Sequence, residues 1–109
     1  MSWEAPAGRL DPAPVSVVVF GSFARGEADS ESDIDVLVVR ARSVREDDDT
    51  WCRDLDEWRL QAARLAGNRV DVLEVGEQDV GRSVGGRQPL WADIERDGVV
   101  VFGAALAAV

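Results

Sequence analysis

Short apolar blocks alternate with polar segments along the whole chain. The blocks at 15–20, 34–39 and 70–75 are rich in valine and isoleucine, which is typical of buried β-strands. A shorter block at 99–102 predicts an edge strand. Within 34–39 the pattern begins by alternation, so that polar and apolar side chains point to opposite faces of the predicted sheet.

The clearest helix is predicted for residues 51–66. Apolar residues recur there at steps of four and three positions, which places them on one face of a helix. Thr50 or Asp49 can cap its start, and Gly67 suits its end. We interpret the apolar face as part of the core rather than as a platform for stacking bases. Its members are Trp51, Leu55, Trp58, Ala62 and Leu65.

Three further helical segments are predicted between the strands. Residues 22–26 form a turn that leads into a short helix, and one helical turn is expected near Gln78. Residues 89–97 form a last helix, because proline is favourable in a first turn and Gly98 can end the helix. The alternating order of strands and helices predicts an α/β domain in which one small sheet is flanked by helices.

A chain of 109 residues corresponds to one domain. Residues 1–14 hold three of the four prolines and predict an irregular N-terminal arm. The domain itself is expected at 15–103, with a tail at 104–109. No apolar run approaches the length of a membrane span, and the N-terminus lacks the apolar segment of a signal peptide.

The formal net charge is -9, and all twelve basic residues are arginines. Such an acidic chain makes nucleic acid an improbable ligand, since phosphate binding depends on clustered cations. It favours a basic partner or a ligand held through a metal ion. The lone Cys52 cannot form an intrachain disulfide, which is consistent with the cytoplasm, and we interpret it as a small apolar helix residue.

The first candidate site is Gly21-Ser22, at the turn after the first strand. Backbone N–H groups at such a turn bind phosphate well, glycine permits close approach, and a serine hydroxyl adds a donor. Arg25 lies one helical turn further on and can reach the same anion. The alternative is an ordinary turn with a helix cap.

The second candidate is a pair of carboxylates, Asp33 and Asp35, on one face of the second strand. They lie roughly 7 Å apart along the backbone, and their side chains can converge on one cation. At about 4 Å, like charges in an intermediate dielectric repel by about 4 kcal/mol. The alternative is that both are solvated at the end of the strand.

The third candidate is Asp71, inside an otherwise apolar strand. If this strand neighbours the second one, Asp71 completes a cluster of three carboxylates. The alternative is an ion pair with one of the arginines. The chain has no histidine, so a Ser-His relay and a histidine-based zinc site are excluded, whereas carboxylates suit Mg²⁺.

The motifs Gly21–Gly26 and Ser32–Val36, with ten residues between Ser22 and Asp33, resemble the signature of polymerase-β-like nucleotidyltransferases. The Ala-Arg-Gly sequence after the serine is most similar to the minimal members, and 94–103 resembles the end of such domains. The resemblance covers about 15–103 and implies a small mixed β-sheet flanked by helices.

By position, the resemblance implies that Gly21, Ser22 and Arg25 hold the nucleotide phosphates. It implies that Asp33 and Asp35 bind two Mg²⁺ ions. The implied reaction is transfer of a nucleoside monophosphate with release of pyrophosphate, and phosphoryl-type transfer needs charge neutralisation more than a covalent nucleophile.

Asp71 is implied as the third metal-binding carboxylate, next to the attacking hydroxyl, and is the natural candidate for the general base. Minimal nucleotidyltransferases commonly act as antitoxins that adenylylate a HEPN-type toxin with ATP and Mg²⁺, so we expect a protein acceptor. Two alternatives stay open: a catalytically idle nucleotide-binding or regulatory module, and nucleotidyl transfer to a small molecule. The chain departs from the family in lacking an evident helix before the first strand.

Overall fold

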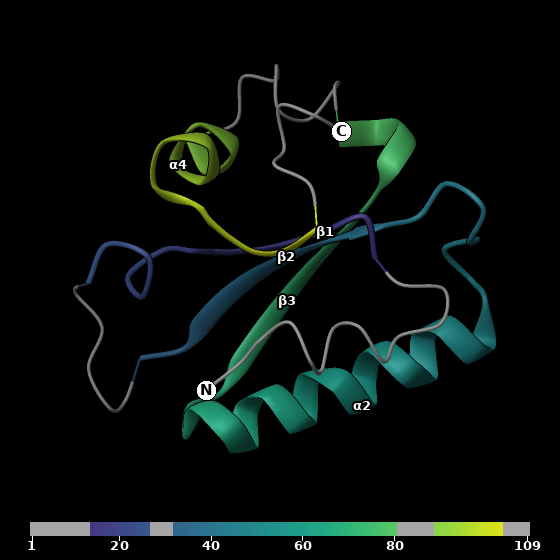
Figure 1. The fold of residues 1–109 in the computed structure, drawn as a ribbon, viewed down its shortest axis with the longest axis horizontal. Helices are drawn as coiled ribbons and strands as arrows, with labels where there is room; N and C mark the ends of the chain where they lie inside the picture. The colour runs from purple at the N-terminus through teal and green to yellow at the C-terminus, as the bar shows by residue number, and fades with distance from the viewer. Residues whose placement is uncertain (1–13, 27–31, 81–88, 104–109) are drawn as a thin grey trace.

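The computed structural model describes residues 14–26, 32–80 and 89–103. Four strands, two α-helices and one 3-10 turn follow one another in this part of the chain (Figure 1). They are β1 (Ser16–Phe20), β2 (Ile34–Arg40), α2 (Asp49–Ala66), β3 (Val70–Gly76), η1 (Glu77–Asp79), α4 (Pro89–Asp97) and β4 (Val99–Gly103). The predicted arm and tail lie almost wholly outside the described residues.

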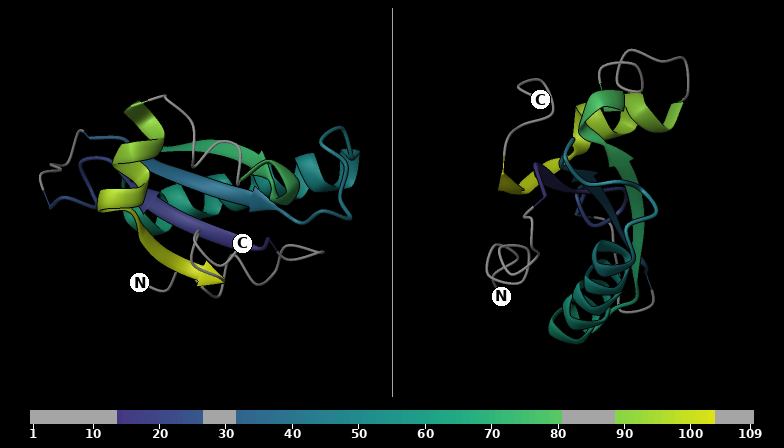
Figure 2. Two further views of the ribbon diagram at one scale, coloured as in Figure 1. Left: turned by 90° about the horizontal axis from the view of Figure 1, so that it is seen from above. Right: turned by 90° about the vertical axis from the view of Figure 1, so that its right-hand side faces the viewer.

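The four strands form one mixed sheet in the order β3-β2-β1-β4. β1 is antiparallel to both of its neighbours, whereas β2 and β3 run parallel. A parallel pair needs a crossover connection, and α2 supplies it. Helix α2 covers one face of the sheet and α4 the other, as the views in Figure 2 show. The α/β prediction is therefore confirmed, and the third strand does neighbour the second, which was the condition for bringing Asp71 near Asp35.

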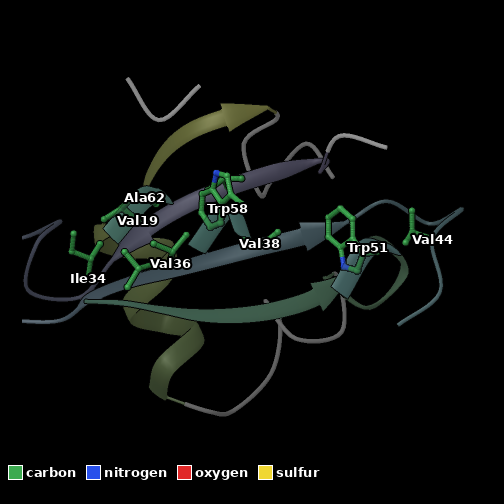
Figure 3. Packing of buried hydrophobic residues seen from close by; sticks show 10 residues of the cluster. Val19, Ile34, Val36, Val38, Val44, Trp51, Trp58 and Ala62 are labelled. Atoms are coloured by element: carbon green, nitrogen blue, oxygen red, sulfur yellow. The ribbon is translucent and has the colours of Figure 1, made fainter. Parts of the chain in front are cut away.

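Two apolar clusters hold the helices to the sheet, because successive strand residues point to opposite faces. Val36 and Val38 face α2 together with Trp51 and Trp58 (Figure 3). Leu37 and Val39 lie in the second cluster, on the α4 side, with Trp91 and Ile94. The two central strands, β1 and β2, thus contain continuous apolar runs because both of their faces are covered.

Helix α2 begins two residues earlier than predicted. The carboxylate of Asp48, rather than Thr50 or Asp49, accepts a hydrogen bond from the backbone N–H of Trp51 at 2.8 Å. This bond satisfies one of the N–H groups that a helix start leaves unpaired. The predicted end is confirmed, since Gly67 adopts a left-handed φ of 76° and donates its N–H to the carbonyl of Ala63.

Three sequence predictions are wrong in detail. Leu65 is 52% exposed, because the core-facing side of α2 continues from Ala62 to Ala66, which packs against the core, and Leu65 lies off this side. Cys52 is exposed on α2 instead of packing as an apolar residue. Residues 21–26 form consecutive turns and no short helix. The N–H of Arg25 donates one helix-like hydrogen bond to the carbonyl of Gly21, and Gly26 then leaves the helical conformation with a φ of 72°.

These burial differences predict very different costs of truncation on one helix. Trp58→Ala removes a side chain that is only 3% exposed and should lower the free energy of unfolding by about 3–5 kcal/mol. Leu65→Ala should change it by less than about 0.5 kcal/mol, since that side chain is half in solvent. Chemical denaturation of both variants checks this. Equal losses in the free energy of unfolding would contradict the observed orientation of α2, in which Trp58 faces the core and Leu65 faces solvent.

Candidate functional site

The register of β2 and β3 brings two predicted site residues together. Asp35 lies directly opposite Asp71 in the parallel pairing of β2 and β3. The residues just before and just after these two aspartates are apolar and also lie opposite one another. Both side chains point to the α4 face, since Leu37 and Leu73, two residues further along each strand, belong to the cluster beneath α4. Asp33 is exposed and precedes β2 by one residue, so it lies at the same end of the sheet.

Gly21 lies against Asp35 because β1 and β2 pair there. Phe20, the last residue of β1, is the register partner of Asp35. Gly21 then turns the chain with a φ of 73°, and a Cβ added at this position would overlap the Oδ2 atom of Asp35. Glycine is therefore needed here for two reasons, the left-handed backbone and the close carboxylate.

The turn after β1 carries the predicted anion-binding residues. Ser22 is half-buried, and the N–H of Arg25 donates to the carbonyl of Gly21 at 3.2 Å. The positive charge of Arg25 acts on the carboxyl of Asp35 and also on that of Asp97, at the end of α4. The turn thus presents one arginine to the end of the sheet where the acidic residues gather.

The pKa of Asp35 is raised above its usual value of 3.8. Partial burial is the largest cause, followed by the negative charges of Asp71 and Asp33, while the charge of Arg25 acts in the opposite direction. Asp33 and Asp71 are therefore each close enough to Asp35 to repel its carboxylate. The expectation of mutually repelling acids on one strand face is consistent with this arrangement.

Asp71 has an arginine neighbour. The guanidinium of Arg69 lies 3.7 Å from Oδ1 of Asp71, and both side chains are about half or more exposed. The ion pair with an arginine that the sequence leaves open is therefore present, and the arginine is Arg69. The sequence could have indicated this arginine, because residues two apart on a strand share a face. Solvent screens such an exposed pair, so that it holds Asp71 only weakly.

The donor set suits a hard divalent cation, since carboxylate oxygens are the ligands that Mg²⁺ prefers. Across the described residues, however, no group of three or more acidic or cysteine side chains is arranged to hold a metal ion. Binding by all three carboxylates would require the side chain of Asp71 to leave Arg69. The strands fix the positions of Asp35 and Asp71 in the backbone, and their side chains can still rotate.

Residues 7–83 match the model of the nucleotidyltransferase domain family. This match spans well over half of the chain, which therefore belongs to the nucleotidyltransferase domain family. It confirms the sequence-based assignment to this class of transferase fold. A search among curated proteins found no match.

Solved structures agree with the family assignment. A structure provisionally described as a minimal nucleotidyltransferase shares 29% identity with a TM-score of 0.51, covering 91% of this chain and 95% of that one. A crystal structure of a toxin–antitoxin with AMP-PNP shares 17% identity with a TM-score of 0.62. A crystal structure of a mutant of the toxin–antitoxin MntA-HpeT shares 16% sequence identity with this chain, with a TM-score of 0.61. The last two alignments each cover 94% of this chain and 72% of the other.

Among the described residues, no helix combines the length and the apolar character that crossing a membrane demands.

Proposed function

We propose that the domain is a Mg²⁺-dependent nucleotidyltransferase that moves AMP from ATP to a hydroxyl group of a protein partner. One observation carries the proposal: strand register places Asp35 opposite Asp71 and against the glycine of a turn that suits phosphate binding. In this proposal the partner is a HEPN-type toxin and the domain is its antitoxin. The exposed, free Cys52 suits a cytoplasmic location.

The similar structures support this choice of substrate and partner. One is a toxin–antitoxin with AMP-PNP, which is an analogue of ATP. In the other toxin–antitoxin, two aspartates that are two positions apart have been changed to glutamate. Asp33 and Asp35 have this same spacing. Transfer of these properties to the present chain rests on the shared fold together with the shared spacing.

Each candidate residue has a role in the proposed reaction. Gly21 and Ser22 bind the outer phosphates through backbone N–H groups and the hydroxyl, and Arg25 neutralises part of their charge. The acceptor oxygen forms a bond to the α-phosphorus, the bond from that phosphorus to the bridging oxygen breaks, and pyrophosphate leaves. Asp71 accepts the proton of the acceptor hydroxyl and passes it to solvent.

Asp33 and Asp35 are the residues that would hold Mg²⁺, with Asp71 joining when it leaves Arg69. When bound, the metal supplies positive charge that stabilises the attacking and leaving oxygens. The raised pKa of Asp35 is consistent with this role, because a site that gathers negative charge is strained until a cation neutralises it. The chain itself supplies orientation through strand register and the close contact at Gly21.

An idle nucleotide-binding or regulatory module is the second candidate. The half-exposed ion pair between Arg69 and Asp71 favours it, because that pair occupies the proposed base in the structure as it stands. Against it stands the repulsion among the three carboxylates, which a protein without metal chemistry would have no reason to keep. Transfer to a small molecule is the third candidate.

Incubation with labelled ATP and Mg²⁺ tests the proposal, with and without the protein encoded by the adjacent gene. We expect label on that protein with the native chain and none with the Asp33→Asn/Asp35→Asn double variant. Nucleotide binding without any transfer would favour the idle module. Label that persists with the double variant would show that these carboxylates are not the reactive centre.

A further inference from the structure

In the sheet that the described residues form, β3 is an edge strand with β2 as its one neighbour. An edge strand presents unpaired backbone N–H and C=O groups to any chain that approaches it. The direction of these groups follows from one hydrogen bond. The N–H of Ile34 donates to the carbonyl of Arg69 at 2.8 Å, so the polar groups of residue 69 point toward β2.

Because the two polar groups of a strand residue point to the same side and alternate along the strand, residues 71, 73 and 75 also face β2. Val70, Val72 and Glu74 therefore point their backbone N–H and C=O groups outward. These three residues also line a groove of about 610 Å³ between β3 and α2. The groove and the outward backbone groups thus form one continuous surface.

The lining of this groove is apolar at its floor and charged at its rim. Leu55 of α2, together with Val70 and Val72, supplies the floor, and Arg59 and Asp56 form an ion pair on the rim. Asp71 also contributes to the lining, within the stretch of β3 that runs from Arg69 to Glu74. The groove on the α2 face therefore runs beside the residue whose carboxylate, on the α4 face, would receive the acceptor's proton.

We propose that the acceptor protein docks by adding an extended segment to the free edge of β3, as a fifth strand. This inference rests on the proposed function and names how its acceptor is held. In an added strand, the residue opposite Asp71 points its side chain to the α4 face, about 5 Å from Asp71. That is the face on which Asp35 lies, so a hydroxyl on this residue enters the site.

The residues before and after the hydroxyl residue point to the other face, into the groove. The floor formed by Leu55, Val70 and Val72 selects apolar side chains at these two positions. The acceptor is therefore a segment in which a hydroxyl-bearing residue stands between two apolar residues. The hydroxyl residue displaces Arg69 from Asp71, which costs little because that pair is exposed.

The single cysteine of the chain provides a direct test. Cys52 is exposed and lines the groove, so that a bulky maleimide attached to it is expected to obstruct the groove beside β3. We expect the bulky label to reduce transfer to the adjacent-gene protein by at least about 10-fold, the scale of a misplaced acceptor. A methylthio label on the same thiol should leave transfer within about 2-fold. Binding of Mg·ATP should not change in either case.

Two controls separate the groove from the rest of α2. The Cys52→Ser variant, treated with the same maleimide, should keep full transfer. In the Cys52→Ser/Leu60→Cys variant the same label sits on α2 outside the groove lining, and transfer should again be normal. Equal transfer by bulky-labelled and unlabelled protein would overturn the proposal.

Backbone variants at one position test strand addition itself. Val72→Pro removes an outward N–H that the β2–β3 pairing does not use, whereas Val72→Ala keeps it. Transfer should fall at least about 10-fold in the proline variant relative to the alanine variant, with Mg·ATP binding retained in both. Similar transfer by the two variants would contradict strand addition.

Amide exchange distinguishes failure of this inference from failure of the proposed function. The native chain is mixed with the adjacent-gene protein, and exchange at the amides of residues 70, 72 and 74 is followed. Protection without any transfer would keep the docking surface and overturn the proposed function. Unchanged exchange in a mixture that transfers nucleotide would overturn the docking surface alone, and unchanged exchange without transfer would overturn both.

Discussion

Asp35→Asn is expected to reduce nucleotidyl transfer by at least about 100-fold and to stabilise the metal-free protein. The loss of transfer follows because the variant removes one of the carboxylates that would hold Mg²⁺, whose positive charge neutralises the reacting phosphates. Losing one charge-stabilising group in an active site has effects of this size. The gain in stability follows because Asp35 is repelled by Asp33 and Asp71 and is partly buried. A binding site often opposes folding in this way.

The stability gain has a defined pH dependence. The native state raises the pKa of Asp35 above 3.8, so it binds this proton more tightly than the unfolded chain does. Ionisation of Asp35 therefore costs native stability as pH rises. Below the unfolded pKa, native protein and variant should be similar. Above the raised native pKa, the variant should be the more stable, and thermal melting in EDTA across pH 3.5–7 would show this.

Asp47→Asn is a suitable control because that carboxylate is 76% exposed and lies far along the chain from the site. It should leave transfer unchanged and should not raise the melting temperature. If Asp35→Asn instead destabilised the metal-free protein, the carboxylate would be contributing a favourable contact. The account of repelling charges at this end of the sheet would then be wrong.

Gly21→Ala is expected to reduce transfer by about 100-fold or more and to lower the free energy of unfolding by about 1–2 kcal/mol. An alanine side chain meets the Oδ2 atom of Asp35, so the carboxylate must move away from the turn. The alanine side chain also strains the backbone at this position, where φ is 73°. The two effects act together on the residues that hold the nucleotide.

Two other glycines separate backbone strain from displacement of Asp35. Gly26 and Gly67 have φ values of 72° and 76°, and a Cβ at either would meet no atom within 4 Å. Gly26→Ala and Gly67→Ala should therefore each lower the free energy of unfolding by about 1–2 kcal/mol, as Gly21→Ala does. Both should leave transfer within about 3-fold of the native chain. Loss of transfer in all three variants would mean that strain alone explains the effect of Gly21→Ala.

Much of the fold follows directly from the sequence. The valine-rich blocks become the four strands, and the steps of four and three positions become α2, because burial on two faces or on one stripe dictates these patterns. The start of α2 was less predictable, since Asp48, Asp49 and Thr50 are all good caps and only the path of the incoming chain selects one. Leu65 shows a similar limit: after Ala62 a step of three to Leu65 and a step of four to Ala66 both fit helical periodicity, and packing places Ala66 against the core.

The site was predictable as a set of residues but not as an arrangement. The motif spacing indicated Gly21 and Asp35 separately, whereas their direct contact depends on β1–β2 register. Similarly, Asp71 lies opposite Asp35 only because α2 returns the chain to the free side of β2. The arginine beside Asp71 and the groove along β3 depend on side-chain directions at a sheet edge, which no single segment of sequence encodes.

The central claim is that the chain transfers a nucleoside monophosphate, and the position of the label in ATP tests it most directly. The native chain and its adjacent-gene partner are incubated with Mg²⁺ and with ATP labelled at either the α- or the γ-phosphate. We predict that α-label appears on the partner and that γ-label is recovered only in pyrophosphate. Label on the partner from γ-labelled ATP, or from neither, would contradict nucleotidyl transfer by this domain.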